Sequence, residues 1–99
     1  MAEPDFFIHQ PLRLKLMAAL YANADGEALD FPRLKALTEA TDGNLGSHLT
    51  ALDQSGYVAI EKDNSGARAR SLVTLTAQGR KAFRRHVAYL REIVDSVTD

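Results

Sequence analysis

The sequence predicts a mainly α-helical domain that carries one small β-hairpin, an α+β fold formed by a single domain over residues 1–99. Three observations support this prediction. Apolar residues recur at the three- and four-residue spacing of helices up to residue 55 and again after residue 76. Between these parts the spacing changes to the alternation of two strands around a short polar loop. A chain of 99 residues without linkers or repeats suits one domain.

A first helix is predicted to begin at Pro11 and to end near Asn23. Proline suits the first turn of a helix because the N–H that it lacks would have no partner there. Leu16 and Leu20 follow at helical spacing, so we expect this helix to be largely buried. The aromatic and aliphatic residues 6–8 are too apolar for a free tail, and we expect them to pack on the body of the protein or on a partner.

A turn at residues 24–27 and a very short strand at 28–30 are predicted next. Asp30 can then cap a second helix that has Pro32 in its first turn. Only a few residues separate this helix from the following one, which is the arrangement of a helix-turn-helix. We expect the apolar face of the second helix to consist of Phe31, Leu34 and Leu37.

The chain is organised around a third helix, predicted over residues 41–55. Thr41 or Asp42 can cap its start, and Gly56 follows its end, where a left-handed residue is favoured. Its apolar stripe is Leu45, Leu49 and Leu52. The opposite face is small, polar and almost uncharged, and comprises Gly43, Asn44, Ser47, Thr50 and Gln54. Such a face suits the major groove of DNA, which admits an α-helix; the alternative is a surface helix that merely lacks long side chains.

A β-hairpin is predicted after this helix. Residues 57–62 and 70–75 alternate and contain β-branched or aromatic side chains, which favours strands. A hairpin that directly follows a helix-turn-helix is a wing, so we predict a winged helix-turn-helix with its wing over residues 62–70. Arginines on a wing can bind phosphates or enter a narrow minor groove; the alternative is a solvated hairpin. The basic residues of the wing are Lys62, Arg68 and Arg70.

A long last helix is predicted over residues 76–99. About 20 helical residues span roughly 30 Å, which is more than a winged-helix body needs. Its apolar residues follow a heptad spacing over two repeats, as in a helix that pairs with a second copy. The alternative is that the stripe packs on the first helix of its own chain. The predicted dimer seam consists of Phe83, Val87, Leu90, Val94 and Val97.

The charge of the chain is polarised, although its net value is only −1. Most acidic residues lie in the first half, whereas the stretch from Asn64 to Arg91 contains several arginines and no acidic residue. The basic part favours an anionic partner such as DNA. The near-neutral total and the acidic Asp42 favour the alternative function, a winged-helix protein-interaction module that binds no DNA.

Composition and spacing exclude several other classes. The absence of cysteine excludes disulfides and thiolate metal sites. His9, His48 and His86 share no spacing typical of a metal site, and no catalytic constellation is recognisable, so we expect neither an enzyme nor a cofactor. No apolar run reaches the roughly 20 residues that span a membrane. The N-terminus lacks the basic region of a signal peptide, so we expect a cytoplasmic protein.

Several segments resemble winged-helix regulators. Residues 9–16 resemble the first helix of ArsR- and MarR-type proteins. Residues 41–45 with 48–49, and residues 75–76 with 79–80, resemble a branch of small single-domain winged-helix transcriptional regulators. The likeness covers nearly the whole chain, and the Thr-Asp-Gly-Asn-Leu run is its most specific part.

The resemblance implies a symmetric homodimer that binds double-stranded DNA, with residues 41–55 in the major groove and the wing at the minor groove. Two such helices would lie roughly 34 Å apart on a pseudo-palindromic site, and a cleft between the first and last helices has room for a small-molecule effector. By position, the residues that face DNA are Thr41, Asp42, Gly43, Asn44, Gly46, Ser47 and Thr50. To these we add the wing cations and His48, which we expect to be half-buried or to contact a phosphate.

The chain departs from the ArsR-type pattern in three respects. Ser47 stands where many of those proteins carry a basic residue, which weakens the phosphate anchoring expected of the third helix. Ala69 stands where relatives often have a proline in the wing. The metal-binding cysteine motif of arsenic sensors is absent.

Overall fold

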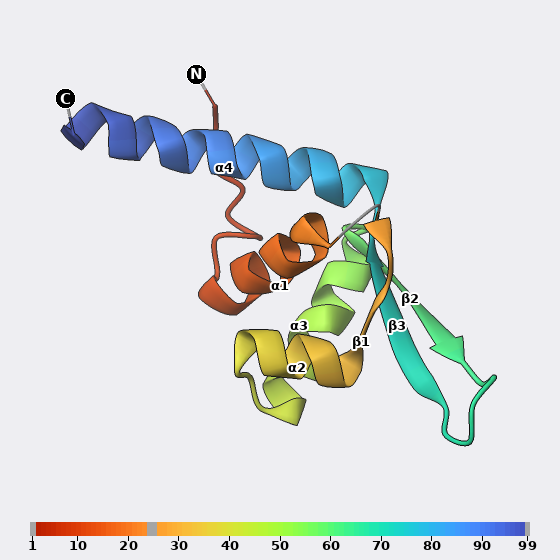
Figure 1. Cartoon of the computed structure of the whole chain (residues 1–99). Helices are drawn as coiled ribbons and strands as arrows, with labels where there is room; N and C mark the ends of the chain where they lie inside the picture. Colours follow the sequence, from red (N-terminus) through yellow and green to blue (C-terminus); the bar gives the residue numbers. More distant parts are fainter. Residues whose placement is uncertain (1, 24–25, 99) are drawn as a thin grey trace.

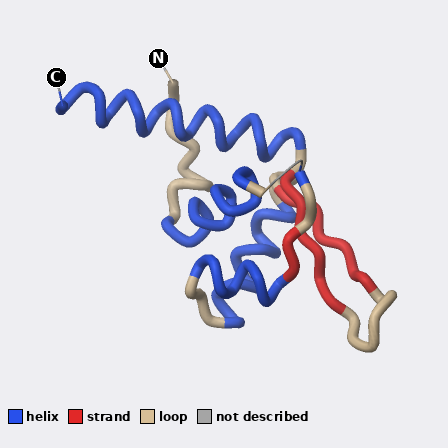
Figure 2. The backbone as a smooth tube through the Cα atoms, in the orientation of Figure 1, coloured by secondary structure: helices blue, strands red, loops and turns tan. Residues whose placement is uncertain are grey.

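The computed structural model describes residues 2–23 and 26–98, and it has the predicted α+β fold. A cluster of short helices lies beside a small sheet, and the long last helix crosses the top of the cluster and extends beyond it (Figure 1). Figure 2 shows the three strands at one side of the molecule, with the wing loop pointing away from the helices. In chain order the elements are α1 (Pro11–Ala22), β1 (Leu29–Asp30), α2 (Phe31–Thr38), α3 (Asp42–Gln54), β2 (Val58–Asp63), β3 (Arg70–Leu75) and α4 (Ala77–Thr98).

Local capping sets the starts of α1 and α2. Helix α1 begins at Pro11 as predicted, and the preceding residue, Gln10, caps it. The Gln10 side chain accepts a hydrogen bond from the backbone N–H of Arg13 at 2.9 Å. Asp30 caps α2 as predicted, because its carboxylate accepts from the backbone N–H of Arg33 at 2.9 Å. The turn predicted at 24–27 includes residues 24 and 25, which lie outside the described residues.

The three strands form an antiparallel sheet in the order β1-β3-β2. Strands β2 and β3 pair from Val58 opposite Leu75 to Asp63 opposite Arg70, which confirms the predicted hairpin. The very short strand predicted at 28–30 also exists, since β1 pairs with β3 at Leu29 and Asp30. The sheet therefore ties the start of α2 to the base of the wing.

The hydrophobic core lies between α1, α2, α3, the sheet and the first half of α4. Its buried apolar residues are Ile8, Leu16, Met17, Leu20, Leu34, Leu45, Leu49, Leu52, Val58, Val73, Ala82 and Phe83. The prediction that Leu37 belongs to the apolar face of α2 is wrong, because this side chain is 46% exposed. Thr38 is buried instead, one turn after Leu34, and its hydroxyl donates to the Leu34 carbonyl at 2.8 Å.

Residues 2–9, which we call the N-terminal strap, pack mainly on their own chain. Ile8 is fully buried, and the ring of Phe7 meets the ring of Tyr57 edge-on at 5.9 Å between centroids. Phe6 points away and is 80% exposed. The expectation that residues 6–8 pack on the body is thus confirmed for Phe7 and Ile8 only.

Helix α4 begins as predicted at Thr76, which caps it. The Thr76 hydroxyl accepts from the backbone N–H of Gly79 at 2.9 Å and donates to the carbonyl of Gly56 at 2.6 Å. The helix has 22 residues, about 33 Å in length, and it makes the molecule elongated at 54 × 25 × 23 Å. Within the described ranges, no helix combines the length and apolarity needed to cross a lipid bilayer.

Candidate nucleic-acid interface

Helix α3 is fixed at both ends by local contacts. Of the two predicted caps, Thr41 performs the role, because its hydroxyl accepts from the backbone N–H of Asn44 at 3.2 Å. Asp42 follows in the first turn and forms an ion pair with Lys35 of α2 at 2.6 Å. At the other end, Gly56 adopts a left-handed φ of 84° that stops the helix. The turn between α2 and α3 is made by Glu39, whose φ of 58° is also left-handed.

The outer face of α3 is open. Leu45, Leu49 and Leu52 are buried as predicted, and the small polar residues on the opposite side are exposed. Apart from the adjoining backbone of α3, no atom of the described residues comes within 4 Å of a methyl group built on Gly43 or Gly46. The exposed residues of this face are Thr41, Asp42, Gly43, Asn44, Ser47, Thr50 and Gln54, and Gly46 is half-exposed at its side.

His48 lies half-buried at the edge of this face. A half-buried histidine was one of the two alternatives predicted from the sequence. Its Nδ1 accepts a hydrogen bond from Nε of Arg13 on α1 at 3.0 Å. The same guanidinium donates to the carbonyl of Phe7 at 3.2 Å and lies 4.2 Å from the centre of the Phe7 ring. The strap, α1 and α3 are therefore linked through one arginine.

The basic side chains of the wing differ in the contacts that they make. Arg70 is held by Asp63 at 3.0 Å and by Asp30 at 3.5 Å, so two carboxylates already share its charge. Hydrogen bonds from Ser65, followed by the contact with Arg70, lower the pKa of Asp63 to about 2, which keeps this carboxylate charged. Lys62 donates to the hydroxyl of Ser71 at 3.1 Å and forms no ion pair with any residue that the structure describes.

Arg68 lies exposed in the loop at the end of the wing. Within residues 2–23 and 26–98 it takes part in no ion pair and no side-chain hydrogen bond. The structure therefore leaves Arg68 and Lys62 available to an anion, whereas Arg70 braces the base of the wing against β1.

The apolar stripe of α4 divides into two halves. Phe83 is only 8% exposed and packs against Tyr21 of α1 with 5.0 Å between ring centroids, so this part of the predicted seam lies in the core of its own chain. Val87 also packs against the core, and Leu90 is half-buried. Beyond the body, where α4 overhangs (Figure 1), Val94 is 55% and Val97 76% exposed.

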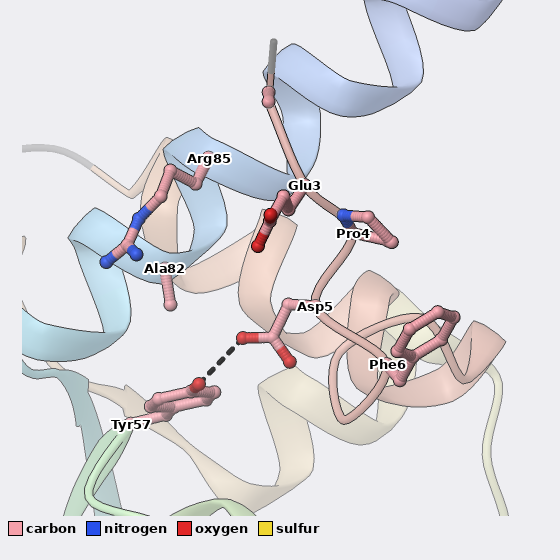
Figure 3. A pocket seen from close by; sticks show the side chains of 8 residues that line it. Glu3, Pro4, Asp5, Phe6, Tyr57, Ala82 and Arg85 are labelled. Atoms are coloured by element: carbon pink, nitrogen blue, oxygen red, sulfur yellow. Dashed lines mark hydrogen bonds between the residues drawn. The ribbon is translucent and has the colours of Figure 1, made fainter.

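The strap closes over a pocket that the sequence did not reveal. Figure 3 shows Asp5 of the strap pointing toward Tyr57, with Arg85 of α4 and Glu3 at the sides of the cavity, which has a volume of about 610 Å³. The Tyr57 hydroxyl donates to the Asp5 carboxylate at 2.6 Å. Burial, together with this contact to a carboxylate, raises the pKa of Tyr57 to about 12. The phenol therefore stays protonated and holds the strap to the start of β2.

His9, the last residue of the strap, meets His86 of α4. His86 of α4 is fully buried, and its Nδ1 accepts from the backbone N–H of Asp5 at 3.0 Å while its Nε2 lies 3.2 Å from Nδ1 of His9. Burial, followed by the proximity of His9, lowers the pKa of His86. Among the described residues, no group of three or more His, Cys, Asp or Glu side chains gathers in a way that would hold a metal ion.

A family model described as a winged helix DNA-binding domain matches residues 12–94 of this chain. Among curated proteins, the uncharacterized protein MJ0432 of Methanocaldococcus jannaschii is 30% identical over 86 residues, which cover 87% of this chain and 90% of that protein.

Solved structures show the same architecture. A transcriptional regulator homologue from Pyrococcus horikoshii superposes with a TM-score of 0.86 at 25% identity, over 96% of this chain and 91% of that protein. A MarR-family transcriptional regulator from Silicibacter pomeroyi superposes with a TM-score of 0.74 at 23% identity, over 93% of this chain but only 59% of that larger protein. The chain therefore belongs to the winged helix DNA-binding domain family, and its fold is that of MarR-type transcriptional regulators.

Proposed function

We propose that this protein binds double-stranded DNA sequence-specifically as a homodimer and thereby regulates transcription. In this proposal α3 enters the major groove and presents Asn44, Ser47 and Thr50 to the edges of the bases. The wing lies at the minor groove, where Arg68 is the cation with no competing carboxylate. Lys62 contacts the backbone beside it.

The observation that carries the proposal is the open outer face of α3. It is exposed, polar and free of long side chains, and a methyl group built on either of its two glycines would meet no described atom within 4 Å beyond the adjoining backbone of α3. A glycine within a helix costs up to about 1 kcal/mol relative to alanine. Its use at Gly43 and Gly46 is explained by a partner that comes close to the backbone of the helix, as the floor and walls of a DNA groove do.

The overhang of α4 supports the homodimer. The stripe that begins with Phe83 in the core continues through the half-buried Leu90 and, beyond the body, as Val94 and Val97, with Ile93 beside it. A second copy that packs its own overhang on this one would cover both stripes at once, as a twofold axis requires. The interface we propose is therefore shorter than the sequence suggested, because the subunit core uses Phe83.

Binding-site selection from random duplexes tests the proposal, followed by measurement of the dissociation constant at several salt concentrations. We expect an enriched pseudo-palindrome with half-sites about one helical turn apart. With roughly six phosphates neutralised per dimer, log K should fall against log[salt] with a slope of about −5. Failure to enrich any sequence, together with no duplex binding at low salt, would instead support a protein-interaction module.

The hollow between α1 and α4 is the place we propose for an effector. It has a volume of about 260 Å³ and is lined by Tyr21, Phe83, Arg84, Val87, Ala88 and Arg91. An aromatic and aliphatic floor beside two guanidinium groups suits a small aromatic carboxylate. Benzoate is a suitable probe: calorimetry should detect its binding to the wild type and a loss of binding in Arg91→Met. Equal binding to both proteins would place the ligand elsewhere.

A further inference from the structure

The contact between Arg13 and His48 connects α3, the helix that we propose for the major groove, to the rest of the subunit. Arg13 lies on α1, and its Nε donates to Nδ1 of His48 on α3 at 3.0 Å. The guanidinium is itself held in place by the Phe7 carbonyl at 3.2 Å and by the Phe7 ring at 4.2 Å. The hydrogen bond therefore joins two side chains whose positions are set by packing.

The chemistry of this pair fixes the tautomer of the imidazole. A guanidinium group has only donors and remains protonated in proteins. Nδ1 of His48 must therefore offer a lone pair, and the proton of the neutral ring lies on Nε2. An imidazolium carries a proton on both nitrogens, so a protonated His48 cannot accept this hydrogen bond.

Nε2 of His48 faces solvent. It makes no hydrogen bond to another residue in the described part of the chain, and every buried side-chain nitrogen or oxygen there has a partner. Because the ring is half-buried, an Nε2 without a partner must reach the surface. It does so one helical turn after Asn44, at the edge of the face that we propose for DNA.

We propose that Arg13 is a positioning residue, which holds His48 as a neutral Nε2–H donor to a phosphate oxygen of the DNA backbone. This inference rests on the proposed function. Contacts of this kind fix the register of a recognition helix on the duplex and read no base. A basic side chain at position 47 would anchor α3 to a phosphate, but this chain has Ser47 there. The contact from the neutral His48 supplies part of that anchoring.

The only charged group in hydrogen-bond contact with His48 among the described residues is Arg13 itself. No ion pair in that part of the chain involves Arg13 or His48. Removing Arg13 should thus release the His48 ring from the single tautomer that this hydrogen bond requires.

The test compares DNA affinity at pH 8, at constant ionic strength and on one selected duplex, for Arg13→Met, Arg13→Lys and Lys15→Met. Arg13→Met should weaken binding about tenfold, because an oriented hydrogen bond to a charged acceptor is lost. Arg13→Lys, which keeps the charge but not the fork of donors, should show a similar loss.

Lys15→Met is the matched control, since it removes an exposed cation from the same helix and should keep the affinity of the wild type. Adding His48→Gln to Arg13→Met should cause no further loss of affinity, because Arg13 acts through His48. Nitrogen-15 spectra of the histidine rings should show the Nε2–H tautomer in free wild type and a mixture of tautomers in Arg13→Met.

The possible failures are distinguishable. If the wild type binds no duplex, the proposed function is wrong and the phosphate contact with it. If the wild type binds but Arg13→Met and Arg13→Lys keep its affinity, or the spectra show the same tautomer in all proteins, only the role given to Arg13 is wrong.

Discussion

Gly43, in the first turn of α3, and Gly46, at the side of the face that we assign to DNA, have open space around them: a methyl group on either would meet no described atom within 4 Å beyond the adjoining backbone of α3. Gly79 of α4 is the opposite case, because a methyl group there would overlap the backbone carbonyl of Tyr57. Small size is therefore required by the fold at Gly79, whereas at the two positions on α3 the proposed contact with a DNA groove accounts for it.

Replacing either glycine of α3 with alanine should separate stability from binding. Gly43→Ala and Gly46→Ala should each raise the free energy of unfolding by about 0.5 kcal/mol, because alanine favours the helix. Each should also weaken DNA binding, because the methyl group holds the helix away from the groove. Urea unfolding and fluorescence anisotropy measure the two effects, and Gly79→Ala should lower stability. Alanine variants that bind DNA as the wild type does would contradict the assigned face.

Asn44 and Arg68 should affect DNA binding in different ways. Asn44→Ala should reduce the preference for the selected site over a mismatched one by about 1–3 kcal/mol, the value of a base contact. Arg68→Ala should weaken binding to all duplexes alike and make the salt dependence shallower. Titrations on matched and mismatched duplexes at two salt concentrations distinguish these outcomes. Two variants with the affinity of the wild type would exclude both contacts.

At the scale of residues, the sequence predicted only contacts between near neighbours in the chain. The caps formed by Asp30 and Thr41 and the left-handed Gly56 involve neighbours within a few residues, so composition and spacing were sufficient. The pairs His9–His86 and Asp5–Tyr57 are 77 and 52 residues apart in sequence. Such residues come together only in the folded chain, so no spacing in the sequence predicts these pairs.

At the scale of elements, α4 serves two purposes along one stripe. Its first half completes the core through Phe83 and its second half is uncovered, with Val97 76% exposed. The heptad spacing correctly predicted an apolar stripe but could not say which chain covers each half. The same limit explains the error at Leu37, where helical spacing identified apolar residues without fixing how far α2 is rotated toward the core.

Val94→Asp tests the overhang as a dimer interface. A carboxylate at a half-exposed position should leave the fold intact but should prevent pairing, since a charge would have to be buried without a partner. Light scattering coupled to size exclusion should show a dimer for the wild type and a monomer for Val94→Asp. Ser96→Asp, which adds the same charge on the exposed part of α4 outside the stripe, should remain dimeric. A dimeric Val94→Asp protein would move the interface elsewhere.

At the scale of the whole molecule, the strap joins parts that are distant in sequence. Asp5 bonds to Tyr57 at the base of the wing and to His86 on α4, and Phe7 holds Arg13, which holds His48. The strap thus connects the helix proposed for dimerisation to the helix proposed for DNA, and its attachment depends on a neutral His86.

The buried His86 should make stability depend on pH. Its pKa is lowered in the folded protein relative to 6.5, so the unfolded chain takes up the proton first. The stability that the neutral ring provides is therefore complete above about pH 6.5 and is lost as the pH falls below that value. Urea midpoints at pH 7.5 and 5.5 should show this loss in the wild type and a smaller loss in His86→Gln. Equal losses would show that other groups dominate.

The uncovered half of α4 has a consequence for how such a regulator is deployed. If another copy of the chain covers it, the concentration of dimer rises with the square of the concentration of chains, by mass action, as long as most chains are monomers. Occupancy of a twofold target would then climb more steeply than gene dosage does. A modest change in synthesis would suffice to switch the target, so the abundance of the protein would itself be a signal.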